Sequence, residues 1–366
     1  MNNKYLEVCS NCVMDSTANG FRKSETGCNY CDSFKKDLNT DAIFDKGDLS
    51  KYVDSLKEKS KHSIYDCIVG VSGGIDSSMV LIKAKEIGLN PLAVHMDNGL
   101  DSELAQNNIN NLIRTLGVDL ITYVINWNEY RMMMDELFNA DVIDVELLYD
   151  NAMLAVNYQF ANRFGIKTIL SGMNTSTEGM QMPTNWNWFK YDQRHIKYFK
   201  SKIKQSIKST FPSIGTNEFL YYTYVKKIKW EHFLDFFNYK KEDSLQELEK
   251  NYGYKRYPYK HYESVFTRFY QGYILPKKFG VDKRKLHLST LIVTGQATRE
   301  ECAIILENAP YDEFELIQDI NYFLKKMKWS QVKLDEYLNR KEISHSNYPS
   351  EKNYWETLIE LRHKLL

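Results

Sequence analysis

The residues best suited to chemistry lie together at positions 72–78, with the sequence Ser-Gly-Gly-Ile-Asp-Ser-Ser. An apolar segment at 67–71 precedes them and apolar residues at helical spacing follow, which predicts a strand that turns into a helix. Paired glycines let the backbone approach phosphate oxygens, and the N–H groups at a helix start face negative charge. Hydroxyls add donors, and a carboxylate beside phosphate calls for Mg²⁺. The alternative is an ordinary glycine-rich turn. We predict that a phosphate-bearing ligand contacts Val71, Ser72, Gly73, Gly74, Asp76, Ser77 and Ser78, and that all of these except Val71 and Ser78 act in catalysis.

The elements that must position this loop alternate along the chain. Predicted strands lie at 67–71, 91–96, 120–125 and 167–170, and predicted helices at 101–116 and 148–164. This alternation indicates an α/β fold with a doubly wound parallel sheet, in which ligands sit at the carboxyl ends of the strands.

The loop is not either of the two common phosphate loops, GxxxxGK[ST] and GxGxxG. It resembles the pyrophosphate loop (PP-loop) of the ATP pyrophosphatases, which split ATP into AMP and pyrophosphate. In NAD synthetase and its relatives, two carboxylates hold Mg²⁺, and the resemblance assigns this role to Asp76 and to Glu178, six residues after Gly172. It also implies that Gly172 contacts ATP and that adenine and ribose lie against Val94, His95 and Met96. The simpler interpretation makes Glu178 a solvated carboxylate and leaves His95 without a ligand.

Four cysteines form a second constellation, Cys9-x₂-Cys12 and Cys28-x₂-Cys31, separated by fifteen residues. Each pair can present two thiolates from one turn, and two such turns make a tetrahedral Zn²⁺ site. Four protein ligands close the site, so we expect structural zinc; disulfides are the alternative. Cys67 and Cys302 have the setting of small core hydrophobes.

Composition bounds the remaining interpretations. With 48 basic and 48 acidic residues in 366, the chain has no net charge that favours nucleic acid or an anionic membrane. No signal-like or membrane-spanning apolar run is visible, so we expect a cytoplasmic protein. Residues 179–250, rich in lysine and aromatics, are interpreted as amphipathic helices rather than as a nucleic-acid surface. The expected domains are a zinc module at 1–35, a helical linker at 36–62, an ATP-binding domain at 63–190 and a mainly helical substrate and partner region at 191–366.

Polar residues concentrate again at 260–299, among aromatic and aliphatic neighbours. Such side chains either bind a ligand or pair with one another, and Arg and His suit phosphate groups. We predict catalytic roles for Lys260 and Arg268. A substrate or pyrophosphate wall is predicted from His261, Glu263, Thr267, Arg284, His287, Ser289, Thr298 and Arg299. An interdomain salt-bridge network is the alternative.

Three features together narrow the family: the opening Cys9–Asp15 segment, the PP-loop, and the region from Lys260 to Arg299 with its Phe-Thr-Arg-Phe and His-Leu-Ser motifs. They resemble the N-acetyl sugar amidotransferases over nearly the whole chain. The resemblance implies an ATP-dependent, ligase-type enzyme of surface-polysaccharide (O-antigen) or flagellar-glycan synthesis, which converts the acetamido group of a nucleotide-linked sugar into an acetamidino group. Because no glutaminase nucleophile is evident, it also implies a separate glutaminase with a cyclase-like companion, similar to the pair in histidine biosynthesis.

Two other functions stay open at this point. A tRNA thiolase would combine zinc cysteines with the same adenylating loop, although the nucleotide domain offers only Cys67 for sulfur transfer. A zinc-ribbon adaptor with a remnant nucleotide site is the third possibility, which the intact loop with Asp76 and Glu178 disfavours.

Overall fold

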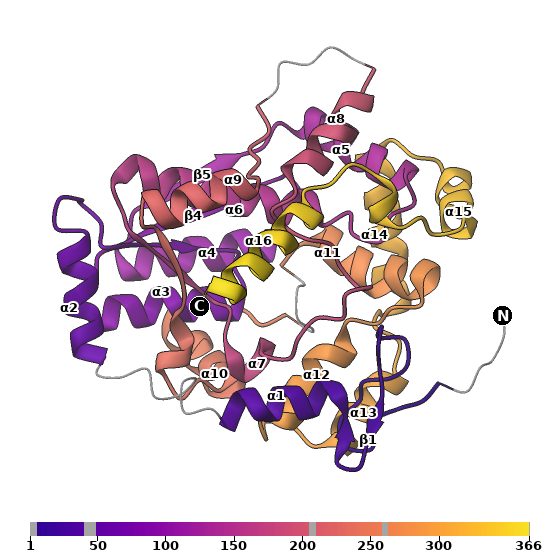
Figure 1. Ribbon diagram of the computed structural model, residues 1–366, viewed down its shortest axis with the longest axis horizontal. Helices are drawn as coiled ribbons and strands as arrows, with labels where there is room; N and C mark the ends of the chain where they lie inside the picture. Colours follow the sequence, from indigo (N-terminus) through magenta and orange to yellow (C-terminus); the bar gives the residue numbers. More distant parts are fainter. Residues whose placement is uncertain (1–5, 40–48, 205–209, 258–262, 366) are drawn as a thin grey trace.

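A five-stranded parallel sheet lies at the centre of the molecule (Figure 1). The computed structural model describes residues 6–39, 49–204, 210–257 and 263–365. The strand order is β5-β4-β3-β6-β7, so the chain moves outward to one edge and then returns to the other side of β3. The strands are β3 (Cys67–Gly70), β4 (Pro91–Asp97), β5 (Leu120–Val124), β6 (Thr168–Ser171) and β7 (Lys229–His232). The doubly wound α/β fold is therefore confirmed, with its switch point between β3 and β6.

Alternate residues of the central strands enter two different cores. Ile68 and Ile169 face one core, which includes the apolar side of α6, while Val69 and Leu170 face the other, which includes α3, α4 and α10. Helices thus cover both faces of the sheet, as a parallel sheet requires. The helices of this part are α2 (Leu49–Lys59), α3 (Ile75–Glu86), α4 (Glu103–Leu116), α5 (Trp127–Asn139), α6 (Leu147–Phe164), α7 (Thr175–Glu178), α8 (Gln193–Lys202), α9 (Thr216–Leu220), η1 (Tyr221–Val225), η2 (Phe233–Phe236) and α10 (Lys241–Tyr252).

The strand β7 is a departure from the sequence analysis, which interpreted residues 179–250 as helical. It pairs in parallel with β6, with Ile169 opposite Trp230. The strand is short, lies at the sheet edge and has no buried residue, so it lacks the apolar pattern that identifies a strand. The sheet therefore continues past the domain boundary expected at residue 190.

Two further units pack beside the sheet. The N-terminal module contains the two-residue strands β1 (Lys23–Ser24) and β2 (Gly27–Cys28) and the helix α1 (Asn29–Asn39), which packs on α12 (Figure 1). The C-terminal region is helical: α11 (Val265–Phe269), η3 (Tyr270–Phe279), α12 (Arg284–Val293), α13 (Arg299–Glu307), α14 (Glu313–Met327), α15 (Gln331–Asn339), η4 (His345–Asn347) and α16 (Lys352–Leu365). Within the described ranges, no helix has both the length and the apolarity needed to span a membrane.

Candidate functional site

The loop between β3 and α3 is closed by its own hydroxyl groups. The Ser72 Oγ accepts a hydrogen bond from the Gly74 N–H at 3.3 Å, and Ser77 and Ser78 donate to the Gly74 carbonyl at 3.2 and 2.8 Å. Gly74 is the N-cap of α3, and no side chain of the described residues caps this helix. Its first N–H groups therefore remain oriented toward the place where a phosphate would lie.

Two glycines permit the close approaches that shape this loop. Gly73 has φ +81°, and a Cβ there would lie 2.8 Å from the carbonyl oxygen of Ala105. Gly172, at the end of β6, would bring a Cβ to 3.0 Å from the Asp76 carbonyl carbon and the Ser77 nitrogen. Because Gly172 has no side chain, the end of β6 can lie directly against the first turn of α3.

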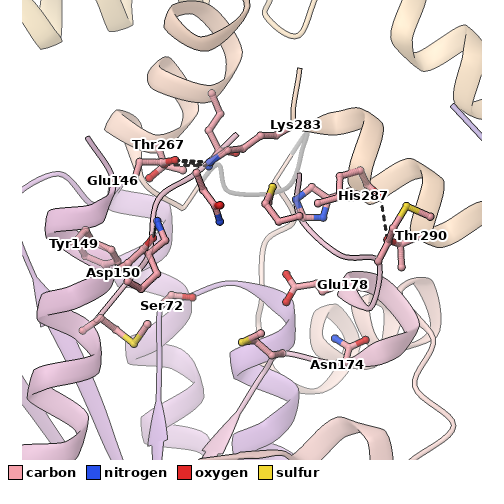
Figure 2. Close-up of a pocket in the computed structure, with 18 of the residues that line it drawn as sticks. Ser72, Glu146, Tyr149, Asp150, Asn174, Glu178, Thr267, Lys283, His287 and Thr290 are labelled. Atoms are coloured by element: carbon pink, nitrogen blue, oxygen red, sulfur yellow. Dashed lines mark hydrogen bonds and ion pairs between the residues drawn. The ribbon is translucent and has the colours of Figure 1, made fainter. Parts of the chain in front are cut away.

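The two carboxylates expected to hold Mg²⁺ both act on one buried tyrosine. Asp76 accepts a 2.5 Å hydrogen bond from the hydroxyl of buried Tyr239. The pKa of Tyr239 is raised, first by burial and then by the charge and hydrogen bond of Asp76 and the charge of Glu178. Glu178 points into the adjoining cavity (Figure 2). Oxygen ligands of this kind fit Mg²⁺. Tyr239 is a positioning residue that sequence analysis missed.

The end of β4 is buried rather than open. Val94 and Met96 belong to the core, and the His95 ring lies between the Val71 carbonyl (2.9 Å) and the Asp101 carboxylate (3.1 Å). Burial lowers the pKa of His95, but Asp101 and the Val71 carbonyl outweigh it and the pKa is raised. His95 thus fixes Asp101, which does line the cavity. The ATP contacts of Val71, Val94, His95 and Met96 stay predictions.

A cavity of about 810 Å³ opens above these strand ends (Figure 2). This volume lies toward the upper end of the range usual for ligand pockets, about 300–1,000 Å³. Its wall combines the loop residue Ser72, the α7 residue Glu178, the first turn of α6 and the C-terminal segment from Glu263 to Thr290. The C-terminal region and the phosphate loop therefore share one cavity.

The predicted 260–299 wall divides into two groups. Glu263, Thr267 and His287 line the cavity, and the Glu263 carboxylate is 3.3 Å from the position of a Gly74 Cβ. Ser102 donates its N–H to the Glu263 carbonyl, which holds this segment over the loop. Lys260 and His261 lie outside the described residues.

Arg268, which was predicted to be catalytic, and the other predicted wall residues lie outside the cavity lining and make structural contacts. Arg268 forms a two-point ion pair with Asp319, with both distances 2.7 Å. Arg284 binds Asp282 and the carbonyls that end α13, and Thr298 caps α13 in a capping box. The salt-bridge alternative therefore describes Arg268 and Arg284. Sequence analysis did not recognise this, because the sequence alone does not show which carboxylate packs against each arginine.

Ser289 and Arg299 bind the cysteine module. The Ser289 hydroxyl accepts from the Val13 N–H at 3.2 Å, and Arg299 donates to the carbonyls of Cys9 and Cys12 at 3.2 Å each. These bonds attach the module to α12 and α13. Ser289 and Arg299, which were predicted to line a substrate or pyrophosphate wall, therefore attach the cysteine module.

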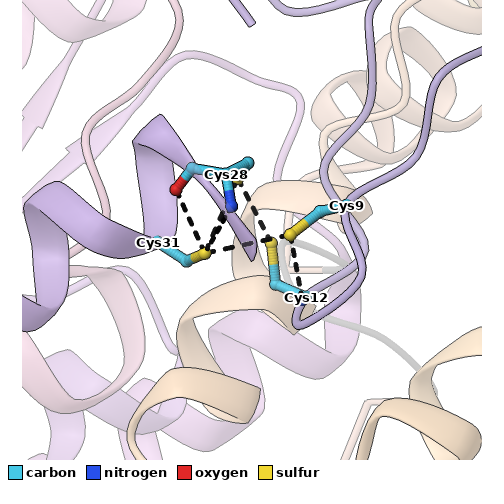
Figure 3. A group of neighbouring side chains, drawn as sticks. All are labelled: Cys9, Cys12, Cys28 and Cys31. Atoms are coloured by element: carbon cyan, nitrogen blue, oxygen red, sulfur yellow. Dashed lines mark hydrogen bonds between the residues drawn. The ribbon is translucent and has the colours of Figure 1, made fainter. Parts of the chain in front are cut away.

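The four cysteine sulfurs converge on one point (Figure 3). Their Sγ atoms are 3.8 Å apart for Cys9–Cys31, 3.9 Å for Cys12–Cys28 and 3.7 Å for Cys28–Cys31. A tetrahedron with Zn–S bonds of about 2.3 Å has sulfurs about 3.8 Å apart. All four are fully buried, so the cluster can hold a closed zinc site.

The cysteine module also reaches the cavity, which sequence analysis did not foresee. Phe34 and Asp37 of α1 line it, and the Phe34 ring occupies the space beside Gly179, where a Cβ would lie 2.4 Å from the ring. Gly179 directly follows Glu178. The module therefore supports the wall that carries a predicted Mg²⁺ ligand.

The remaining cysteines have no reactive setting. Cys67 is buried in β3 and Cys302 in α13, and burial raises the pKa of both thiols. A raised pKa leaves little thiolate, the nucleophilic form. Neither cysteine resembles a sulfur carrier.

The start of α6 carries further cavity residues that sequence analysis missed: Glu146, Tyr149 and Asp150 (Figure 2). Asp150 pairs with Lys190, and Glu146 pairs with Lys283. The available signal was topological. A helix that leads into a parallel strand begins at the carboxyl edge of the sheet, so the start of α6 belongs there.

Two protein-family models match different parts of the chain. The NAD synthase family model matches residues 48–186, and the model of the LPS biosynthesis protein WbpG-like, C-terminal domain, matches residues 263–362. No curated protein matches significantly.

Solved structures with some likeness are distant and carry no argument of their own. A predicted tRNA methyltransferase subunit from Methanocaldococcus jannaschii is 15% identical, with TM-score 0.30, over 50% of this chain and 75% of that one. The NH3-dependent NAD synthetase from Campylobacter jejuni is 16% identical, with TM-score 0.29, over 60% and 84%. The NMN synthetase from Francisella tularensis is 12% identical, with TM-score 0.30, over 63% and 97%.

The two matched regions are those that meet at the cavity: the sheet with its phosphate loop, and the helical segment that begins at Glu263. Their combination supports an ATP-dependent, sugar-modifying enzyme and an N-acetyl sugar amidotransferase-type PP-loop family.

Proposed function

We propose that this enzyme converts the acetamido group of a nucleotide-linked sugar into an acetamidino group, with ATP split into AMP and pyrophosphate. The observation that carries the proposal is the single cavity shared by the phosphate loop and the WbpG-like C-terminal segment. The product would enter a surface polysaccharide such as an O-antigen, or a flagellar glycan.

An amide is unreactive toward ammonia for two reasons: its carbon is a poor electrophile and its oxygen is a poor leaving group. Adenylation of the oxygen overcomes both. The amide oxygen attacks the α-phosphorus of ATP and pyrophosphate departs, which leaves an O-adenylated imidate. Ammonia then adds to the imidate carbon, AMP leaves with the C–O bond electrons, and one proton is lost to give the amidine. No enzyme nucleophile takes part.

The chain's own residues position the reactants and receive charge. The N–H groups at the start of α3 and the Ser72 hydroxyl face the phosphates, where they stabilise charge on the departing pyrophosphate. Asp76 and Glu178 would hold Mg²⁺, which supplies positive charge at the phosphates when bound. Zinc at the four cysteines would be structural, because the protein fills every ligand position.

Ammonia would come from a separate glutaminase, with a cyclase-like companion. Cys67 and Cys302, the two cysteines outside the cluster, are buried with raised pKa values and do not suit glutamine hydrolysis. The partner would deliver NH₃ before it is protonated.

Purified chain is incubated with ATP, Mg²⁺ and candidate acetamido sugars, with either ammonium chloride or glutamine. We expect equal amounts of AMP and pyrophosphate and a product about one mass unit lighter, with ammonium at raised pH and not with glutamine. Addition of the glutaminase should restore glutamine use. Efficient use of glutamine by the lone chain would contradict the separate partner, and activity with sulfide but not ammonia would favour tRNA thiolation.

A further inference from the structure

The cavity has an inner wall of paired charges that the proposed chemistry does not use. We call this wall the α6 cluster and define it as Glu146, Asp150, Lys190 and Lys283, with Asp144 behind it. The first four line the cavity. Figure 2 shows Glu146 and Asp150 at the start of α6, with Lys283 opposite. Tyr149 and Glu263 line the same cavity, so the cluster shares it with the segment that covers the phosphate loop.

Each ammonium group of the cluster already has a carboxylate partner. Lys190 lies 2.6 Å from Asp144 and 2.8 Å from Asp150, and Lys283 lies 2.9 Å from Glu146. Gln271 donates to both Glu146 oxygens at 3.0 Å. The lysines are therefore held in place and their charge is compensated before any ligand enters.

The cluster as a whole is not positive. Three carboxylates face two ammonium groups, which leaves one excess negative charge. Burial raises the pKa of Asp150; Lys190 opposes this, and the charges of Asp144 and Glu146 add to it. A further anion placed here would lose its hydration and would meet no uncompensated cation among the described residues of the cluster.

Resting on the proposed function, we propose that the α6 cluster is the subsite for the ring of the acceptor sugar, and that it selects a neutral, hydroxyl-bearing sugar over the corresponding uronic acid. A hydroxyl donates and accepts at once, so it can bridge an ammonium group and a carboxylate of one pair. A substrate carboxylate only accepts, and it would compete with Asp150 and Glu146 for the same lysines.

The neighbouring lining fits a pyranose ring. Asn187 and Gln271 add amide groups, and Met153, Phe266 and Leu286 add apolar surface for the C–H face of a sugar. A mixture of a few oriented polar groups with apolar walls is usual for small-ligand sites.

The test uses calorimetric binding to the full chain without ATP. The probes are UDP-N-acetylglucosamine and its C6-carboxylate counterpart, UDP-N-acetylglucosaminuronic acid, which share the nucleotide and differ at C6. We expect the neutral sugar to bind at least tenfold more tightly. Asp150→Asn and, independently, Glu146→Gln remove one negative charge each and should narrow this ratio several-fold. Glu58→Gln, at an exposed side chain of α2, is the matched control and should leave the ratio unchanged.

Equal or tighter binding of the carboxylate sugar by the wild-type chain would overturn the subsite, as would an unchanged ratio in both cluster variants. Binding of neither probe would also overturn it as stated. Amidine formation from any acetamido sugar, followed separately by mass spectrometry, would still leave the proposed function standing. Absence of amidine with every acetamido sugar, together with the expected binding ratio, would contradict the function and not the subsite.

Discussion

A single added methyl group at Gly172 should test whether the phosphate loop depends on the close approach of the end of β6 to the first turn of α3. In Gly172→Ala the new Cβ would lie 3.0 Å from the Asp76 carbonyl carbon and the Ser77 nitrogen, and 3.1 Å from the Asp76 Cβ. Ordinary carbon contacts lie at about 3.5 Å or more, so the loop must retreat by roughly 0.5 Å. Its contacts are backbone atoms at a helix start, which no rotamer change can move.

The size of the effect follows from that shift. Misplacement by 1 Å can cost about 100-fold in rate, so a shift of half that size should lower kcat/KM for ATP about tenfold, or about 1.4 kcal/mol. Overpacking should lower the free energy of unfolding by about 1–3 kcal/mol. Pyrophosphate release and thermal unfolding measure the two effects.

A nearby control adds the same methyl group without a close contact. Gly70→Ala in β3 would place its Cβ 3.4 Å from the Asn157 side chain, an ordinary contact. We expect activity within about threefold of wild type, a change of about 0.6 kcal/mol or less. Wild-type kcat/KM in Gly172→Ala would refute the argument that the loop depends on this approach.

Three further predictions address the metals and the pH response. Cys9→Ser should release zinc and also weaken ATP binding, because the cysteine module carries Phe34 to the cavity wall; metal analysis and nucleotide titration of the same sample check both effects. Asp76→Asn should keep the fold and lose Mg²⁺-dependent pyrophosphate release by 100-fold or more, of the order of 3 kcal/mol; substantial release would contradict the assignment. The buried pair His195–His345, joined by a 2.9 Å hydrogen bond, should destabilise the protein in acid. Burial lowers the pKa of both histidines, that of His345 to about 3. The contribution of the neutral pair to the free energy of unfolding is therefore complete above about pH 6.5 and declines as the pH falls toward 3. Thermal unfolding from pH 7 to 4 should show the decline, and His345→Gln should flatten it.

Features encoded within a few consecutive residues could be predicted from the sequence. The PP-loop is contiguous, so its glycines, hydroxyls and helix start specify a strand–turn–helix without distant partners. The cysteine pairs are similar, since the C-x₂-C spacing presents two sulfurs from one turn, and the four sulfurs do converge. The buried apolar strands β3, β4 and β6 identified the parallel sheet for the same reason.

Features that depend on distant partners were missed or assigned to another role. Arg268 and Arg299 have the chemistry of phosphate ligands, but Arg268 folds against Asp319 and Arg299 against the backbone of the cysteine turns. The edge strand β7 is recognisable only by its pairing with β6.

The phosphate loop, the cysteine cluster and the class of fold can be read from the amino-acid sequence, because each depends on local spacing or on periodic apolar burial. Which side chains share the cavity depends on how distant segments pack. Glu146 meets Lys283 across 137 residues of chain, and Phe34 reaches Gly179 from another module. Whether a polar side chain faces a ligand or an internal partner depends on such long-range contacts, since the free energy of burying a charge is set by what packs against it.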